Sequence, residues 1–265
     1  MRWTPGQRSD NLEDRRGQGF GGLGVGRLGV GGVVILLVLS LIFKRDFFSL
    51  ISGGQATPAG AVASTPEEEH LADFVSFVFD TTQSTWRMIL AHRADGARYQ
   101  DAKLVLFRDA VQSACGFAQS VTGPFYCPND HKVYIDLGFY DELRGRFGAP
   151  GDFAQAYVLA HEVGHHVQTL LGDNFGTSNA GSVRRELQAD CYAGVWGNFM
   201  QREGVLEPGD VEEGLGAAAA VGDDRLQRMS TGTVSPETFT HGTSAQRSSW
   251  FHRGLASGRI ESCQT

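Results

Sequence analysis

A run of sixteen uncharged residues, 28–43, constrains this chain more than any other feature. As a helix it would span roughly 24 Å, slightly less than the bilayer core of about 30 Å. It has no polar face, which argues against a helix on the surface of a soluble core. A cleaved signal peptide fits poorly, because the Ala-x-Ala site Ala61-Val-Ala63 lies about twenty residues past the run. The run therefore predicts an uncleaved transmembrane anchor over residues 28–45.

Charge is distributed unevenly about this run. Residues 1–45 hold seven Arg or Lys and three Asp or Glu. Residues 46–265 hold sixteen Arg or Lys and twenty-seven Asp or Glu. The net charge of −7 argues against nucleic-acid binding driven by bulk charge. The positive-inside tendency predicts that residue 1 lies in the cytosol and the acidic body outside. The expected parts are a basic, Gly-rich cytosolic tail (1–27), a single-pass anchor (28–45), a flexible linker (46–64) and one folded domain (65–265).

The domain shows the periodicities of a mixed α and β fold. Thr65-Pro-Glu-Glu68 is a capping box, and apolar residues then recur at three- and four-residue steps, which predicts a helix over 66–92. Further strands are expected at 103–107, 125–127 and 132–137, and further helices at 152–171, 183–203, 209–228 and 244–257. A few strands followed by helices indicate the α+β class.

The segment 152–171 contains the motif His161-Glu-Val-Gly-His165. Histidines four residues apart share one face of a helix, so His161 and His165 can bind one Zn²⁺ while Glu162 reaches a metal-bound water. Such a zinc lowers the pKa of the water to about 7, and Glu162 would then carry its proton to the leaving amine. The alternative is an ordinary amphipathic helix with solvated His and Glu. The apolar neighbours of the motif argue against it, because buried ionisable groups need a compensating partner.

A catalytic zinc also needs a third protein ligand. Glu186 and Asp190 are again four residues apart, in the predicted helix 183–203. We expect Glu186 to be the third ligand and Asp190 to accept the free N–H of a ligating histidine, which would fix its tautomer. Two alternatives remain open: Asp190 as the ligand, and a plain acidic helix face.

With both motifs in place, the chain resembles the gluzincin clan of zinc peptidases and, more narrowly, the bacterial neutral zinc metallopeptidase family often called YpfJ-like. The resemblance extends over nearly the full length. The segments that carry it, besides the two motifs, are Met1-Arg-Trp3, Asn11-Leu-Glu-Asp-Arg-Arg16, Cys115-Gly-Phe-Ala-Gln119, Gly123-Pro-Phe-Tyr-Cys-Pro128, Tyr134-Ile-Asp-Leu-Gly-Phe139, Leu187-Gln-Ala-Asp-Cys-Tyr-Ala-Gly-Val-Trp196 and His241-Gly-Thr-Ser-Ala-Gln-Arg247.

The resemblance implies a zincin-like domain with a single Zn²⁺ and a membrane-anchored or exported protein that acts on peptides or proteins. Combined with the charge asymmetry, it predicts an inner-membrane protein whose catalytic domain lies on the periplasmic side. Two rival functions remain: a non-catalytic zinc-containing binding or assembly protein of the cell envelope, and a hydrolase of something other than peptides. The presence of Glu162 disfavours the first, because a structural zinc needs no general base.

Several other residues carry weaker expectations. In zincin-like folds an edge strand beside the cleft pairs with an extended substrate, and strand 132–137 is the candidate; an ordinary sheet strand is the alternative. His241 or Tyr192 is expected to donate a hydrogen bond to the oxyanion. Arg247 would orient His241 or pair with a carboxylate. For both His241 and Arg247 the alternative is a capping role at the surface. His166 is expected to be structural.

The four cysteines fit an oxidising compartment. Cys115 and Cys127 flank a short segment with Gly and Pro and are the best disulfide candidates, a bond that would contribute about 3 kcal/mol in the chain-entropy model. Cys191 with Cys263 is a second possible pair. A zinc–thiolate site is disfavoured, because the sequence has no Cys-x-x-Cys pair.

Overall fold

The computed structural model describes residues 1–17, 64–93, 96, 98–119 and 123–265. The expected anchor (28–45) and all but the last residue of the expected linker (46–64) lie outside these residues. Among the helices within the described ranges, none combines the length and the apolar character needed to cross a bilayer.

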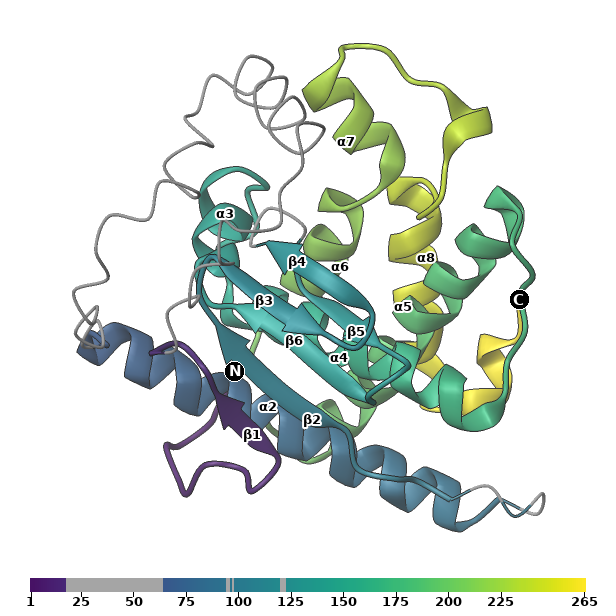
Figure 1. Ribbon diagram of the computed structural model, residues 1–265. Helices are drawn as coiled ribbons and strands as arrows, with labels where there is room; N and C mark the ends of the chain where they lie inside the picture. The colour runs from purple at the N-terminus through teal and green to yellow at the C-terminus, as the bar shows by residue number, and fades with distance from the viewer. Residues whose placement is uncertain (18–63, 94–95, 97, 120–122) are drawn as a thin grey trace, which may run out of the picture. The chain divides into compact units, whose positions relative to one another are not determined.

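The described elements form a mixed α+β domain, as expected (Figure 1). In chain order they are β1 (Leu12–Asp14), α2 (Pro66–Ala91), β2 (Lys103–Phe107), β3 (Ala110–Ser113), β4 (Gly116–Gln119), β5 (Phe125–Cys127), β6 (Lys132–Asp136), α3 (Phe139–Gly145), α4 (Asp152–Leu171), α5 (Asn179–Arg202), α6 (Asp210–Ala220), α7 (Asp223–Ser230), η3 (Pro236–Thr238), α8 (Ser244–Ser257) and η4 (Ile260–Cys263).

The first fifteen residues belong to the folded domain. β1 pairs in parallel with β2, and Arg8 donates to Asp73 of α2 over 2.6 Å. Residues 1–15 and 65–265 therefore form one compact unit. Residues 1–15 thus group with the folded unit, whereas the sequence predicts a separate tail of residues 1–27. Its arginines were counted as a topology signal, but Arg8 is an ion-pair partner of the body.

The main sheet has the strand order β1-β2-β6-β5, in which the first three strands are parallel and β5 runs antiparallel to β6. One face packs on the helices through Leu104, Leu106 and their neighbours on β6. The other face packs on the β3–β4 hairpin, so the domain has three layers, and Figure 1 shows the hairpin and α4 on opposite faces of the sheet.

The expectation that strand 132–137 is a sheet edge is wrong. β6 lies between β2 and β5, and β5 is the edge strand beside it. The alternating pattern suggested one buried face, but Tyr134 and Asp136 on the other face are also buried, with 1% and 7% exposure. The hairpin that covers this face had not been predicted, so the pattern understated the burial of β6.

The helices lie close to their expected positions, with two differences. α5 begins at Asn179, where Ser178 caps it by accepting the N–H of Gly181; this first turn carries no apolar periodicity, so the sequence placed the start at 183. The expected helix 209–228 is two helices, α6 and α7, interrupted at Gly222. An ideal Cβ at Gly222 would lie 2.3 Å from the backbone N of Ser244, so close approach to the start of α8 requires a glycine there.

The expected Cys115–Cys127 disulfide is present, and so is the second possible pair, Cys191–Cys263. Cys115, in the β3–β4 turn, is bonded to Cys127 at the end of β5, and Cys191 of α5 is bonded to Cys263 of η4. The first bond fastens the hairpin to the edge strand. The second fastens the C-terminal segment to α5, next to Asp190.

Candidate metal centre

Helices α4 and α5 bring the two sequence motifs together at a close crossing. An ideal Cβ at Gly164 would lie 3.0 Å from the carbonyl oxygen of Ala189. The glycine inside the His-Glu-Val-Gly-His motif therefore lets the backbone of α5 approach α4 beside the histidines. The sequence analysis had assigned no role to Gly164.

His161, His165 and Glu186 form the centre. Their ligand atoms all lie within 4.8 Å of one another. Nε2 of His161 is 3.2 Å from Oε2 of Glu186, and Nε2 of His165 is 3.5 Å from Oε1. Two ligand atoms of a tetrahedral zinc, each about 2.0–2.1 Å from the metal, lie about 3.3 Å apart. The donor set and its spacing therefore fit a single Zn²⁺.

Asp190 holds His161 from the side opposite Glu186. Its Oδ1 is 2.8 Å from Nδ1 of His161 and also accepts hydrogen bonds from Tyr157 and Arg247. Oδ2 accepts a second bond from Arg247, from Nε over 2.8 Å. Asp190 and Arg247 are both buried. The structure thus places Asp190 as the partner of His161 and pairs Arg247 with that carboxylate, not with His241.

A glutamine holds His165. Oε1 of Gln168 lies 2.9 Å from Nδ1 of His165, and Gln168 is only 4% exposed. The sequence analysis missed this residue because a neutral glutamine in a helix carries no charge that demands a partner. Its spacing, three residues after His165 on the same helix face, was the available signal.

The charges of the centre balance one another. Burial opposes a charged imidazole, but the Asp190 and Glu186 carboxylates outweigh burial and raise the pKa of His161 to about 9. Burial also disfavours an ionised Glu186, yet the two imidazoles hold the pKa of that carboxyl well below its usual value. The pocket therefore favours positive charge, and a metal that binds there displaces protons from the histidines.

Glu162 lies next to His161 on α4 and is 9% exposed. Burial raises the pKa of its carboxyl, against the opposing effect of the two neighbouring histidines. A raised pKa is the direction that general acid–base catalysis at neutral pH requires.

His241 is positioned by a residue that the sequence analysis missed, Asp223 at the start of α7. Oδ1 of Asp223 lies 3.0 Å from Nδ1 of His241, and Oδ2 accepts the backbone N–H groups of Thr240, His241 and Gly242 at 2.6–3.0 Å. An ideal Cβ at Gly242 would lie 3.4 Å from Leu187, so this loop lies against α5 beside the residue that follows Glu186. The side chain of His241 is 49% exposed.

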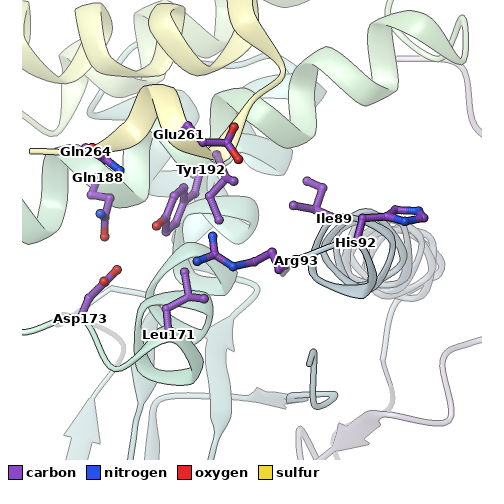
Figure 2. A pocket seen from close by; sticks show the side chains of 10 residues that line it. Ile89, His92, Arg93, Leu171, Asp173, Gln188, Tyr192, Glu261 and Gln264 are labelled. Atoms are coloured by element: carbon purple, nitrogen blue, oxygen red, sulfur yellow. The ribbon is translucent and has the colours of Figure 1, made fainter. Parts of the chain in front are cut away.

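Tyr192 lies elsewhere. Its ring packs edge-on against Trp86 of α2, with 4.9 Å between the ring centroids. It lines a cavity of about 580 Å³ between the C-terminal ends of α2 and α4, α5 and η4, which contains none of the three ligand residues (Figure 2). Tyr192 is therefore no longer a candidate for the oxyanion donor.

His166 is structural, as expected. It is fully buried, its Nε2 donates to the carbonyl oxygen of Gln100 over 2.6 Å, and its Nδ1 lies 3.1 Å from the hydroxyl of Tyr126 on β5. A carbonyl only accepts, so Nδ1 is the unprotonated nitrogen. Burial lowers the pKa of His166 to about 4, which keeps the ring neutral. His166 thereby fastens α4 to the edge strand.

A second acidic group could also attract a cation. Asp152, Asp210 and Glu213 lie at the N-terminal ends of α4 and α6. The α-ammonium of Met1 is 2.8 Å from Asp152 and 3.3 Å from Asp210. A cation of the chain thus already neutralises part of this group, and it contains no histidine. It is an ion-pair cluster rather than a rival metal centre.

Two histidines and a glutamate on one helix, with an acidic side chain beside them on the next helix, are typical of zincin-type centres. The profile of the family described as "Putative neutral zinc metallopeptidase" matches residues 1–265. The chain is 48% identical over 285 aligned positions to YpfJ of Escherichia coli K12, covering 100% of this chain and 98% of that protein. It belongs to this family.

More distant relatives cover only part of the chain. The Mycobacterium bovis protein Mb2605 is 47% identical over 184 positions, which are 63% of each chain. The names of these relatives state no activity. No solved structure matches the chain significantly.

Proposed function

We propose that the chain is a zinc-dependent peptidase whose single zinc is held by His161, His165 and Glu186. One arrangement carries the proposal: the Nδ1 atoms of both rings are engaged, by Asp190 and Gln168, so both Nε2 atoms are free to bind a metal beside Glu186. Three protein ligands leave a fourth position for water, which distinguishes a catalytic zinc from a structural one. A zinc bound there would activate this water and polarise the scissile carbonyl.

Glu162 acts as the general base and then the general acid. It accepts the proton of the attacking water and delivers it to the nitrogen of the leaving amine. Its place in the motif, one residue after His161 on the buried part of α4, supports this role.

His241 donates a hydrogen bond to the oxyanion of the tetrahedral intermediate. Asp223 accepts from Nδ1 of His241 and from the backbone of its loop, which orients the ring before substrate binds. Because Nδ1 gives its proton to this bond, the ring donates through Nε2 in its doubly protonated form. The half-exposed ring suits a group that must meet a substrate entering from solvent.

The edge strand β5 pairs with the substrate backbone. β5 contacts α4, and Tyr126 of β5 bonds to His166 of α4. An extended peptide added to this edge would run beside the helix that carries the catalytic motif. The role first expected for strand 132–137 is thereby proposed for its neighbour.

We further propose that the domain acts outside the cytosol and associates with the membrane through residues 28–43. Two disulfides between all four cysteines support an oxidising compartment. Alkaline carbonate extraction tests the membrane association: release of the full-length protein into the supernatant contradicts it.

The deciding experiment measures bound zinc and cleavage of casein for the wild type and two variants. Glu162→Gln should retain zinc and lose activity, because the general base is gone while the ligands remain. Glu186→Ala should bind zinc more weakly. Activity that survives in Glu162→Gln would refute the mechanism, and a wild type that binds zinc yet cleaves no peptide would favour a binding protein of the cell envelope.

A further inference from the structure

The orientation of Gln168 is determined by its partners. Its amide nitrogen lies 2.7 Å from the carbonyl oxygen of Arg185 and 3.0 Å from Oε1 of Gln188, and its amide oxygen faces Nδ1 of His165. Because a backbone carbonyl only accepts, the nitrogen of Gln168 must face Arg185. The oxygen then accepts a hydrogen bond from the protonated Nδ1 of His165. This fixes one tautomer of His165 and leaves the lone pair on Nε2, the atom nearest Glu186.

Gln168 is itself held by a second buried glutamine. Gln188, which is 7% exposed, accepts from Gln168 through its oxygen. Figure 2 shows the side chains of Gln188 and Asp173 pointing toward one another in the cavity, with Tyr192 beside them. The bonds therefore run in one direction, from His165 to Gln168 and from Gln168 to Gln188.

We propose that Gln168 is the positioning residue of the zinc ligand His165, and that Gln188 keeps Gln168 in its productive orientation. The inference rests on the proposed function, because it takes His165 as a ligand. A ring that is already oriented loses less conformational freedom on binding metal. A hydrogen bond at Nδ1 also makes the lone pair of Nε2 a stronger metal ligand. Gln168 therefore raises the affinity of the centre for zinc without touching the metal.

The two histidines are held by groups of different charge. The carboxylate of Asp190 is partly neutralised by Arg247, and the amide of Gln168 is neutral. Glu186 is the only carboxylate among the three proposed ligands, and Arg247 lies 4.0 Å from its Oε2. A zinc with one anionic ligand keeps net positive charge, which favours polarisation of a substrate carbonyl through its oxygen.

A purely structural role makes a different prediction. Gln168 also joins α4 to the backbone of α5 through Arg185. If that were its whole role, its loss would lower the stability of the metal-free protein and leave zinc affinity unchanged. Zinc affinity and metal-free stability must therefore be measured separately.

The test uses the full chain and zinc itself, with the dissociation constant measured by competition against a chromophoric chelator. Gln168→Met removes the amide at similar volume and should weaken zinc binding about 10- to 100-fold. Gln188→Met should weaken it less, and the double variant should match Gln168→Met alone. Gln155→Met, a half-buried glutamine earlier on α4, is the control and should bind zinc as the wild type does.

Nitrogen NMR of histidine-labelled protein supplies a second measurement, because Gln168→Met should remove the preference of His165 for protonated Nδ1. A zinc affinity of Gln168→Met within about threefold of wild type would overturn the inference. If Gln168→Met fails to fold, Gln188→Met decides, and an unchanged dissociation constant overturns it equally. Zinc binding that persists in the His165→Ala variant would instead refute the proposed function.

Discussion

His161 and His165 present the same ring nitrogen to Glu186, yet chemically different groups orient them. The partner of His161 was predictable, because an aspartate four residues from a glutamate in an apolar helix must find a partner. Gln168 and Asp223 were not: a glutamine carries no charge, and Asp223 acts on a loop nearly twenty residues away. At the residue scale, charged groups near the motif were predictable and neutral or distant ones were not.

The Asp223–His241 pair gives a prediction at this scale. His241→Ala should lower kcat about 10²- to 10³-fold, the usual cost of losing one oxyanion donor, with zinc content unchanged. Asp223→Ala should lower kcat by a similar factor, because it frees the ring and three backbone N–H groups of the loop. The double variant should be no worse than His241→Ala. His252→Ala, an exposed histidine on α8, serves as the control, and full activity in His241→Ala would disprove the role.

At the scale of elements, glycines allow the helices to approach closely enough to form the centre. An ideal Cβ at Gly194 of α5 would lie 2.0 Å from the carbonyl oxygen of Phe251 on α8, and one at Gly254 would lie 1.9 Å from that of Cys191. Backbone therefore lies against backbone between α5 and α8. This contact brings Arg247 of α8 to Asp190 of α5 and so supports His161 indirectly.

Replacement of these glycines tests the packing. Gly194→Ala should lower the free energy of unfolding by about 3 kcal/mol or more, at the upper end of overpacking costs, because the clash is with backbone that cannot rotate away. The matched control is Gly216→Ala on α6, where a Cβ meets nothing within 4 Å. That change should stabilise the protein by about 0.5–1 kcal/mol. Urea unfolding measures both, and wild-type stability in Gly194→Ala would contradict the close contact.

Elements with local signals were predictable and those that depend on distant pairing were not. The capping boxes at Thr65 and Thr243 and the Gly172 stop mark helices that the structure contains. β1 has three residues, of which one is apolar, and it forms because β2 pairs with it from ninety residues further along the chain. The β3–β4 hairpin likewise shows no continuous apolar face, and without it the sequence understated the burial of β6.

At the scale of the whole molecule, β1 sets a condition on membrane topology. Its hydrogen bonds to β2 place residues 1–15 and 65–265 in one folded unit, and a folded unit lies on one side of a bilayer. A single crossing between them would separate β1 from β2. The sheet therefore predicts that residues 1–15 and 65–265 lie on the same side of the membrane, whereas the positive-inside tendency predicts opposite sides.

Cysteine labelling tests this condition. We would introduce Asp10→Cys and Glu237→Cys, both at exposed positions, one at a time, and treat spheroplasts with a membrane-impermeant maleimide. Both sites should be labelled together or protected together, and both should be labelled after detergent treatment. Labelling of Glu237→Cys alone in intact spheroplasts would restore the single-pass topology and would mean that β1 does not pair with β2 in the cell. Labelling of both would place the metal centre and the N-terminal strand outside the cytosol, where the two disulfides can form and persist.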